Sequence, residues 1–281
     1  MFEARDIRVA LPDRSRKPLI GQAPLIEILK GISLSVEAGA ALGIVGESGS
    51  GKSTLARTML RLYRPSGGTL TFEGRDITDL DEAALRPLRA RMQIIFQDSQ
   101  SALNPRLTIG ATLAEPMLSY RLAASRRAAR DAAAALLARG GLSADFLLRY
   151  PHQLSGGQRQ RVGIARALAL NPALIVADEI VSGLDVSVQA QILDLLRTLR
   201  RETSLALVLI SHDLSVVRVV CDTVLVMRQG EIVEAGPCAD LFANPRHPYT
   251  RQLLRSVPLP VVDPGWLSGA SLEEETAPPA G

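Results

Sequence analysis

The chain has 281 residues, of which 47% are hydrophobic, and its 32 basic and 29 acidic residues give a formal net charge of +3. This allows one large domain or two modest ones with a packed core, and the near balance of charge, without a basic stripe interleaved with aromatics, argues against nucleic-acid binding. Because no stretch reaches the roughly 18 apolar residues of a spanning helix and no signal peptide is evident, we expect a cytosolic protein.

Two segments near the N-terminus, Met1–Leu11 and Leu25–Val36, alternate apolar and polar residues, which predicts two strands separated by a loop. The short apolar run Ala41–Val45 predicts a buried strand, and Ser53–Tyr63 predicts a helix. Between them lies the sequence G-E-S-G-S-G-K-S, which matches the G-x-x-x-x-G-K-[ST] pattern of a phosphate-binding loop. A chance glycine-rich turn of this pattern is expected in about one such chain in a hundred.

The spacing of this motif has a physical reason. Its glycines let the backbone turn so that successive N–H groups point at phosphate oxygens, and the positive end of the following helix faces the anion. Lys52 adds a charge for the β and γ phosphates, and Ser53 offers a hydroxyl to Mg²⁺. The predicted nucleotide-binding residues are therefore Gly46, Glu47, Ser48, Gly49, Ser50, Gly51, Lys52, Ser53 and Thr54.

After the first predicted helix, the sequence predicts two further strands and then a region of different composition. Thr69–Phe72 and Met92–Phe96 predict two further strands, the second closed by Gln97. From Leu107 to Gln153 alanine, leucine and arginine dominate, which predicts a helical subdomain inserted into the sheet domain.

A second glycine motif, L-S-G-G-Q at Leu154–Gln158, opens a predicted helix, Arg159–Leu170. By composition it is rarer than the phosphate loop by roughly tens-fold. Its glycines leave backbone N–H groups open at a helix N-terminus, which makes it a second candidate anion site. Because one chain carries two predicted phosphate-binding helix N-termini, we expect that two chains enclose the nucleotide between them.

An acidic pair, Asp178 and Glu179, ends the apolar run Leu174–Ala177. In a phosphate-loop enzyme a carboxylate at this place holds Mg²⁺, and a second one polarises the attacking water. The alternative is an ordinary acidic strand end, which is common, but the phosphate loop upstream favours the functional interpretation.

The remaining segments alternate between strand and helix patterns, which predicts an α/β fold with a largely parallel sheet. The tail from Pro258 is rich in proline, glycine, glutamate and alanine, so we expect disorder there. The predicted elements are a helix over Val186–Arg201, a strand over Leu205–Ile210, a helix over Leu214–Val220, and a hairpin whose strands Val224–Met227 and Ile232–Val233 flank Gln229–Gly230.

Over nearly all of Met1–Arg255 the chain resembles the ATP-binding subunits of ABC transporters, because several independent motifs fall in order. These are the Walker A loop Gly46–Ser53, the Q-loop Gln97, the signature Leu154–Gln158, Walker B Leu174–Glu179, the D-loop Ser182–Asp185 and the switch His212. The resemblance implies a P-loop NTPase of ABC type: a mostly parallel sheet core, an antiparallel β subdomain and an inserted helical subdomain at about 107–157. It places the ATPase domain at 1–257 and a disordered tail at 258–281.

The resemblance also implies roles. ATP and Mg²⁺ would be bound by Lys52 and Ser53, with Asp178 and Gln97 also at the metal. Glu179 would polarise the attacking water and His212 would sense the γ-phosphate, although a lone histidine after an apolar strand is more often structural. The opposing subunit's site would be completed by Ser155, Gly156, Gly157, Gln158 and Asp185.

Three segments narrow the resemblance to the peptide/nickel uptake family: Ser101–Arg106, Tyr150–His152 and Asn244–Thr250. The resemblance implies that the chain lies at the cytoplasmic face of the inner membrane. Its implied partners are a second ATPase subunit (a paralogue or a copy of this chain), two transmembrane permeases and, indirectly, an extracytoplasmic solute-binding protein. Nucleic acid is not among the implied partners. Asp98–Arg106 would dock on the membrane subunits. The resemblance does not identify the transported solute.

The chain departs from the family pattern at three places. Leu11 stands where an aromatic residue usually stacks on adenine, and Ile180–Val181 replaces the usual Pro-Thr after the glutamate. Arg8–Ala10 lacks the family's more basic run, a departure that we expect to be neutral. Rival functions are a soluble ABC-type ATPase acting on DNA or ribosomes, a non-catalytic nucleotide-binding partner and a small-molecule kinase. The intact Lys52 and Glu179 disfavour the non-catalytic partner, and a kinase would not need the signature.

Overall fold

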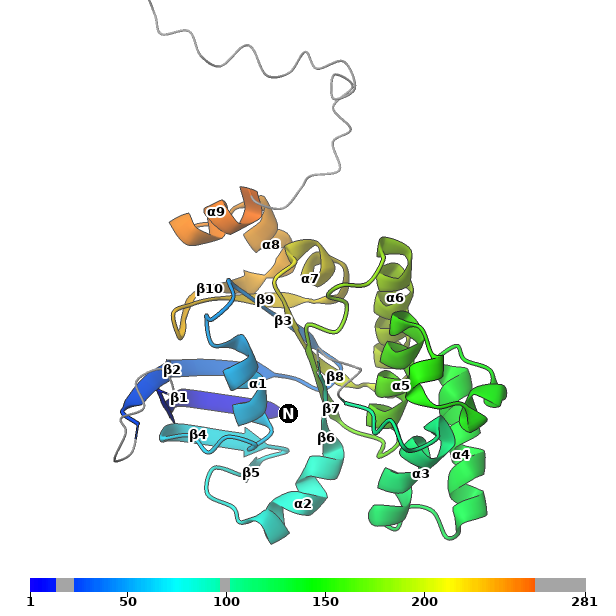
Figure 1. Cartoon of the computed structure of the whole chain (residues 1–281). Coiled ribbons are helices and arrows are strands. Elements are labelled where there is room, and N and C mark those ends of the chain that lie inside the picture. The colour runs from blue at the N-terminus through cyan, green and yellow to red at the C-terminus, as the bar shows by residue number, and fades with distance from the viewer. Residues whose placement is uncertain (14–22, 97–101, 256–281) are drawn as a thin grey trace, which may run out of the picture.

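The computed structural model describes residues 1–13, 23–96 and 102–255, which form two sheets with helices between and beside them (Figure 1). One sheet is antiparallel, in the order β2-β1-β4-β5, and the other has six strands in the order β10-β9-β3-β8-β7-β6. The strands are β1 (Phe2–Pro12), β2 (Leu25–Val36), β3 (Ala41–Val45), β4 (Gly67–Phe72), β5 (Arg75–Asp76), β6 (Met92–Ile95), β7 (Leu174–Asp178), β8 (Ala206–Ser211), β9 (Thr223–Arg228) and β10 (Glu231–Pro237).

The six-stranded sheet is parallel apart from β10, which pairs antiparallel with β9. The predicted fold class, a mostly parallel core sheet with an antiparallel β subdomain, is confirmed. The predicted hairpin is confirmed as well. Gln229 and Gly230 have φ of 50° and 86°, which suits the two-residue turn of a right-twisted hairpin.

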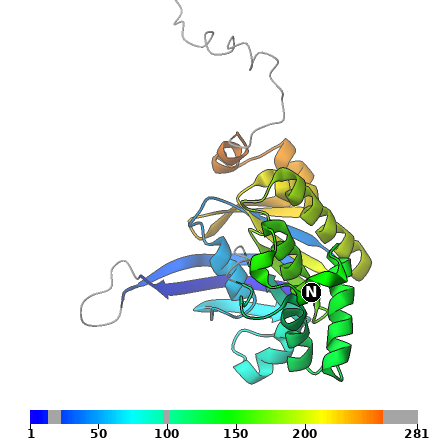
Figure 2. The ribbon, with the colours of Figure 1, turned by 45° about the vertical axis from the view of Figure 1, so that its right-hand side comes forward.

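Helices cover both faces of the core sheet, and β1 and β2 project from the body as a long ribbon (Figure 2). Alternate side chains of a buried strand point to opposite faces, so Leu174 and Val176 join a core with α1 and the antiparallel sheet, while Ile175 and Ala177 join a core with α5, α6 and α7. The helices are α1 (Lys52–Met59), α2 (Glu82–Arg91), α3 (Ile109–Ser119), α4 (Arg126–Arg139), η2 (Ala144–Leu148), η3 (Pro151–Gln153), α5 (Gly156–Leu168), α6 (Val186–Thr203), α7 (Leu214–Val220), α8 (Cys238–Ala243) and α9 (Pro248–Arg255).

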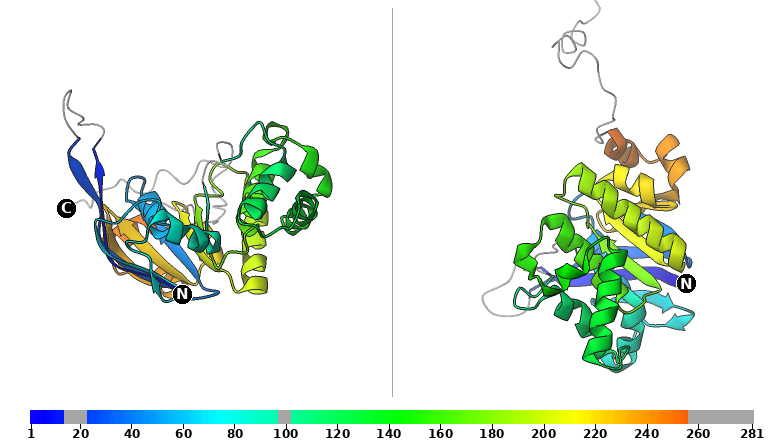
Figure 3. Two further views of the ribbon diagram at one scale, coloured as in Figure 1. Left: turned by 90° about the horizontal axis from the view of Figure 1, so that it is seen from below. Right: turned by 90° about the vertical axis from the view of Figure 1, so that its right-hand side faces the viewer.

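The alanine-rich segment, predicted as a helical subdomain at about 107–157, forms α3, α4 and two short 3₁₀ turns. It lies to one side of the two sheets (Figure 3). Among the described helices, none combines the length and the apolar character that crossing a membrane requires. Gln97 and the tail from Pro258 lie outside the described residues, and the domain limits 1–257 and 258–281 stay predictions.

Two predicted helix limits are wrong for local reasons. The first helix ends at Met59 rather than Tyr63, because Arg61 takes a left-handed φ of 53° and its buried guanidinium donates to the Ile77 carbonyl at 2.9 Å. The helix after the signature begins at Gly156 rather than Arg159, because Ser155 caps it. The sequence patterns also missed α2, α8 and α9.

Candidate active site

The loop Gly46–Ser53 leaves the carboxyl end of β3 and enters α1, as its sequence predicts. Two of its glycines are required by the structure. Gly46 has a φ of 151°, and a Cβ there would lie 2.2 Å from the Met227 carbonyl oxygen. Gly51 caps α1 with a φ of 102°, a conformation that side chains rarely allow. The loop backbone is therefore packed against β9 at Gly46 and turns sharply into α1 at Gly51.

Lys52 folds back into this loop and is only 5% exposed. Its Nζ donates to the carbonyl oxygens of Gly46, at 2.7 Å, and Glu47, at 2.8 Å. Burial lowers the pKa of Lys52, although nearby carboxylates, Glu179 first among them, oppose this shift. The ammonium group is thus inside the loop, where phosphate oxygens can replace the two carbonyls as its acceptors.

Ser53 and Asp178 come together although they lie far apart in the sequence. The Ser53 hydroxyl donates to Asp178 Oδ1 at 3.2 Å, and Asp178 is 4% exposed at the end of β7. Burial raises the pKa of Asp178, and the Ser53 hydrogen bond opposes that rise. A hydroxyl beside a carboxylate at the mouth of a phosphate loop is an oxygen donor set of the kind that Mg²⁺ takes, so the residues fit the predicted ion.

Glu179 and His212 face each other at the ends of the neighbouring strands β7 and β8. Glu179 Oε2 lies 3.4 Å from His212 Nδ1. Glu179 takes a left-handed φ of 50°, and its N–H donates to the Ile210 carbonyl at 2.9 Å. The bond extends the β7–β8 pairing by one residue, and the left-handed φ ends the strand direction at Glu179. Because β3, β8 and β7 are adjacent and parallel, their carboxyl ends bring the phosphate loop, His212 and the acidic pair to one edge.

The signature forms the first turn of α5, on the other side of the core sheet from α1 (Figure 1). Ser155 and Gln158 make a reciprocal capping box: the Ser155 N–H donates to Gln158 Oε1 at 3.0 Å, and the Gln158 N–H donates to Ser155 Oγ at 3.3 Å. Gly157 is buried against α6, where a Cβ would lie 2.4 Å from Val188 Cγ1. Among the described residues, no hydrogen bond joins this turn to the phosphate loop of the same chain.

The D-loop, Ser182–Asp185, links Glu179 to the start of α6. The Ser182 N–H donates to the Glu179 carbonyl at 3.1 Å, and Asp185 is the N-cap residue of α6. Ile180 and Val181, which replace Pro-Thr, are 2% and 4% exposed. Their side chains therefore anchor the loop in the apolar core. Leu11 is half-buried on β1, opposite Ile26.

Sequence reasoning missed two contacts that hold the phosphate loop from outside. The Glu47 N–H donates to the Tyr249 hydroxyl at 2.9 Å, and the Gly230 N–H donates to the Ser50 carbonyl at 3.0 Å. Tyr249 lies within Asn244–Thr250, which the sequence marks only as family-like. No local pattern shows that this segment returns to residue 47.

A phosphate loop at the end of one parallel strand, with an acidic pair at the end of a nearby strand, defines a P-loop ATPase. The dimeric ATP-binding cassette MJ0796 bound to ADP and Pi has a similar fold, with a TM-score of 0.75 and 31% identity over 85% of this chain and 99% of that one. A model of the ABC transporter family matches residues 29–182, and one of the oligopeptide/dipeptide transporter C-terminal region matches residues 233–280.

Relatives at higher identity agree with these matches. The chain is 52% identical to a probable peptide ABC transporter ATP-binding protein of Sinorhizobium fredii, over 84% of this chain and 67% of that protein. It is 48% identical to the oligopeptide transport ATP-binding protein AppF of Bacillus subtilis, over 92% of this chain and 78% of that protein. The chain belongs to the ABC transporter family of ATP-binding proteins, and the predicted resemblance is confirmed.

Proposed function

We propose that this chain hydrolyses ATP to energise the import of peptides or related solutes, including nickel complexes, through separate membrane subunits. The observation that carries the proposal is the single edge of the core sheet where the phosphate loop, the Ser53–Asp178 hydrogen bond of 3.2 Å and the Glu179–His212 contact of 3.4 Å occur together. The oligopeptide/dipeptide match over residues 233–280 and the names of the relatives support the solute class. Those names give no support to the nucleic-acid alternative.

The geometry supports the following roles for the residues in this proposal. On nucleotide binding, Lys52 leaves the Gly46 and Glu47 carbonyls for the β and γ phosphates. Ser53 and Asp178 would hold Mg²⁺, with Gln97, which lies outside the described residues, as a further ligand. When bound, Mg²⁺ would offset negative charge on the phosphates. Glu179 accepts a proton from the attacking water, and His212, beside it, contacts the γ-phosphate.

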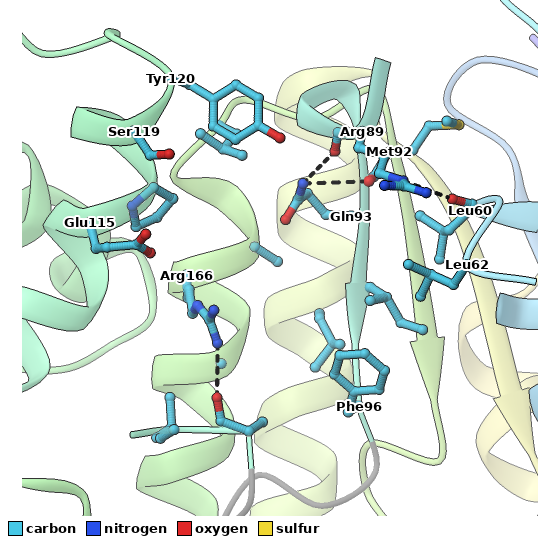
Figure 4. Close-up of a pocket in the computed structure, with 18 of the residues that line it drawn as sticks. Leu60, Leu62, Arg89, Met92, Gln93, Phe96, Glu115, Ser119, Tyr120 and Arg166 are labelled. Carbon is cyan, nitrogen blue, oxygen red and sulfur yellow. Dashed lines mark hydrogen bonds between the residues drawn. The ribbon is translucent and has the colours of Figure 1, made fainter. Parts of the chain in front are cut away.

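The membrane subunits need a docking surface, and a cleft of about 330 Å³ lies between β6, α3 and α5 (Figure 4). Its rim carries the apolar side chains of Leu62 and Phe96, which are 46% and 40% exposed, and the charged side chains of Glu115 and Arg166. Phe96 immediately precedes Gln97, and Arg166 donates to the Ala102 carbonyl at 2.9 Å. We therefore propose that the cleft receives a cytoplasmic segment of a permease at the inner membrane.

The test of catalysis is Glu179→Gln in the complete transporter complex. The amide keeps the size of the side chain but cannot take a proton from water. We expect ATP binding to persist and steady-state hydrolysis to fall by about 10²-fold or more. Glu202→Gln, at an exposed position of α6, is the matched control and should hydrolyse ATP at the normal rate. Near-normal hydrolysis by Glu179→Gln would show that another group activates the water.

A further inference from the structure

The phosphate loop is tied from outside by residues that the proposed mechanism does not use. Its second residue, Glu47, donates its N–H to the Tyr249 hydroxyl at 2.9 Å. Its fifth residue, Ser50, accepts the Gly230 N–H at 3.0 Å, and the Gly230 carbonyl in turn accepts the Lys30 N–H at 2.9 Å. The loop therefore has one anchor in the β9–β10 turn and another in α9.

Tyr249 is itself held firmly in place. It is 4% exposed, and the Arg228 guanidinium carbon lies 5.0 Å from the centre of its ring. The Tyr249 N–H donates to His247 Nδ1 at 3.2 Å. Arg228 is the last residue of β9, so the hairpin that bonds Ser50 also supports the tyrosine ring.

The turn before α9 is fixed to the same hairpin. Glu234 on β10 accepts the N–H groups of Arg246, at 2.7 Å, and His247, at 3.0 Å. Burial opposes ionisation of Glu234, but the hydrogen bonds that it accepts outweigh this and lower its pKa. A charged acceptor for two backbone N–H groups is a strong attachment. The Tyr249 hydroxyl thus has a fixed position relative to the phosphate loop.

The direction of the hydrogen bond from the Glu47 N–H to the Tyr249 hydroxyl indicates what this bond does for the loop. The Glu47 N–H points to Tyr249 and is not available to a phosphate, whereas its carbonyl accepts Lys52 Nζ. When Lys52 moves to the nucleotide, the carbonyl loses this partner, and the Tyr249 bond remains to hold the residue. Without the hydroxyl, a partly buried N–H would lose its acceptor or the loop would shift to find another.

We propose that Tyr249 is a positioning residue that holds the phosphate loop in its nucleotide-receiving conformation, so that the C-terminal segment tunes ATP affinity. The proposal rests on the loop being the ATP site, as proposed above. The segment around Tyr249 falls within the match to the oligopeptide/dipeptide C-terminal region. Under this proposal the segment acts on nucleotide binding rather than on the transported solute.

The test is Tyr249→Phe in the full chain, which keeps the ring and its Arg228 contact and removes only the hydroxyl. The net contribution of one hydrogen bond corresponds to about a 2- to 12-fold change, so we expect Mg²⁺–ATP affinity by calorimetry to fall within that range. Amide exchange of the segment covering Glu47 should become faster. In the complete complex, KM for ATP should rise while kcat at saturation stays within about twofold, whereas general misfolding would lower kcat without raising KM.

Tyr63→Phe is the matched control, because the Tyr63 hydroxyl also accepts one hydrogen bond and its ring also contacts an arginine. Arg57 donates to the Tyr63 hydroxyl at 3.3 Å, and its guanidinium carbon lies 5.8 Å from the ring centre. If Tyr249→Phe matches Tyr63→Phe in both ATP affinity and amide exchange, the proposal is wrong. The variant Lys52→Ala distinguishes a failure of the proposed ATP site from a failure of the proposed role of Tyr249. Unchanged ATP affinity in Lys52→Ala would overturn the loop as the ATP site, whereas its loss, together with normal affinity in Tyr249→Phe, would overturn only the role of Tyr249.

Discussion

In the proposed function Lys52 exchanges partners when a nucleotide binds, and the partners that it leaves are carbonyls of its own loop. Such a residue is predictable from the sequence, because the glycine spacing that shapes the loop lies within eight positions. The same holds for the acidic pair Asp178–Glu179 at a strand end. Tyr249 was not predictable as a partner of the loop, because 202 positions separate it from Glu47 and the pairing depends on the whole C-terminal fold.

Leu11 stands at the position where the family pattern predicts an aromatic residue under the adenine. It is half-buried opposite Ile26 near the end of the β1–β2 ribbon, and at the predicted adenine site it would offer an aliphatic surface and no ring. Leu11→Tyr adds a stacking face worth about 0.5–1.5 kcal/mol if it packs well. We expect ATP affinity to rise severalfold in calorimetry, with discrimination against GTP measured alongside. Leu25→Tyr, at a 68% exposed position of β2, is the control, and equal affinities in both variants would place the adenine elsewhere.

At the scale of elements, local patterns were informative for strands and poor for helix ends. The parallel strands are runs of buried apolar residues, and the hairpin is marked by Gln229–Gly230. In contrast, α1 ends early because of the hydrogen bond from Arg61 to the Ile77 carbonyl, which no pattern within the helix reveals. The short helices α8 and α9, of six and eight residues, are below the length at which periodicity is clear.

Asp98–Arg106 is predicted to dock on the membrane subunits, and the structure describes residues 102–106 of this segment. Arg106 is exposed, and its N–H donates to Asn104 Oδ1 at 3.0 Å, so a charge reversal there leaves the core intact. Arg106→Glu should weaken co-purification with the permease subunits while ATP affinity stays unchanged. Arg139→Glu, at the exposed end of α4, is the control. Full retention of the permeases by Arg106→Glu would place the docking surface outside this segment.

At the scale of the whole molecule, the two helix ends that are predicted to bind phosphate belong to different parts of the chain. The phosphate loop opens α1 between the sheets, and the signature opens α5 on the far side of the core sheet (Figure 1). A second phosphate-binding end is redundant if one chain closes its own site. A helix N-terminus gains by facing the γ-phosphate, so the arrangement favours two subunits that each complete the other's site.

The measurement that tests this most directly is nucleotide occupancy of each ATPase subunit in the assembled complex, by photo-crosslinking, with Ser155→Arg in this chain. Ser125→Arg at α4 controls for a lost helix cap, because Ser125 likewise accepts the Ala128 N–H at 3.2 Å. The shared-site account predicts that Ser155→Arg leaves ATP bound to this chain's own loop and impairs hydrolysis of the nucleotide held by the partner. Loss of ATP binding to this chain, purified alone and folded, would show that the signature acts within one subunit and would contradict the account.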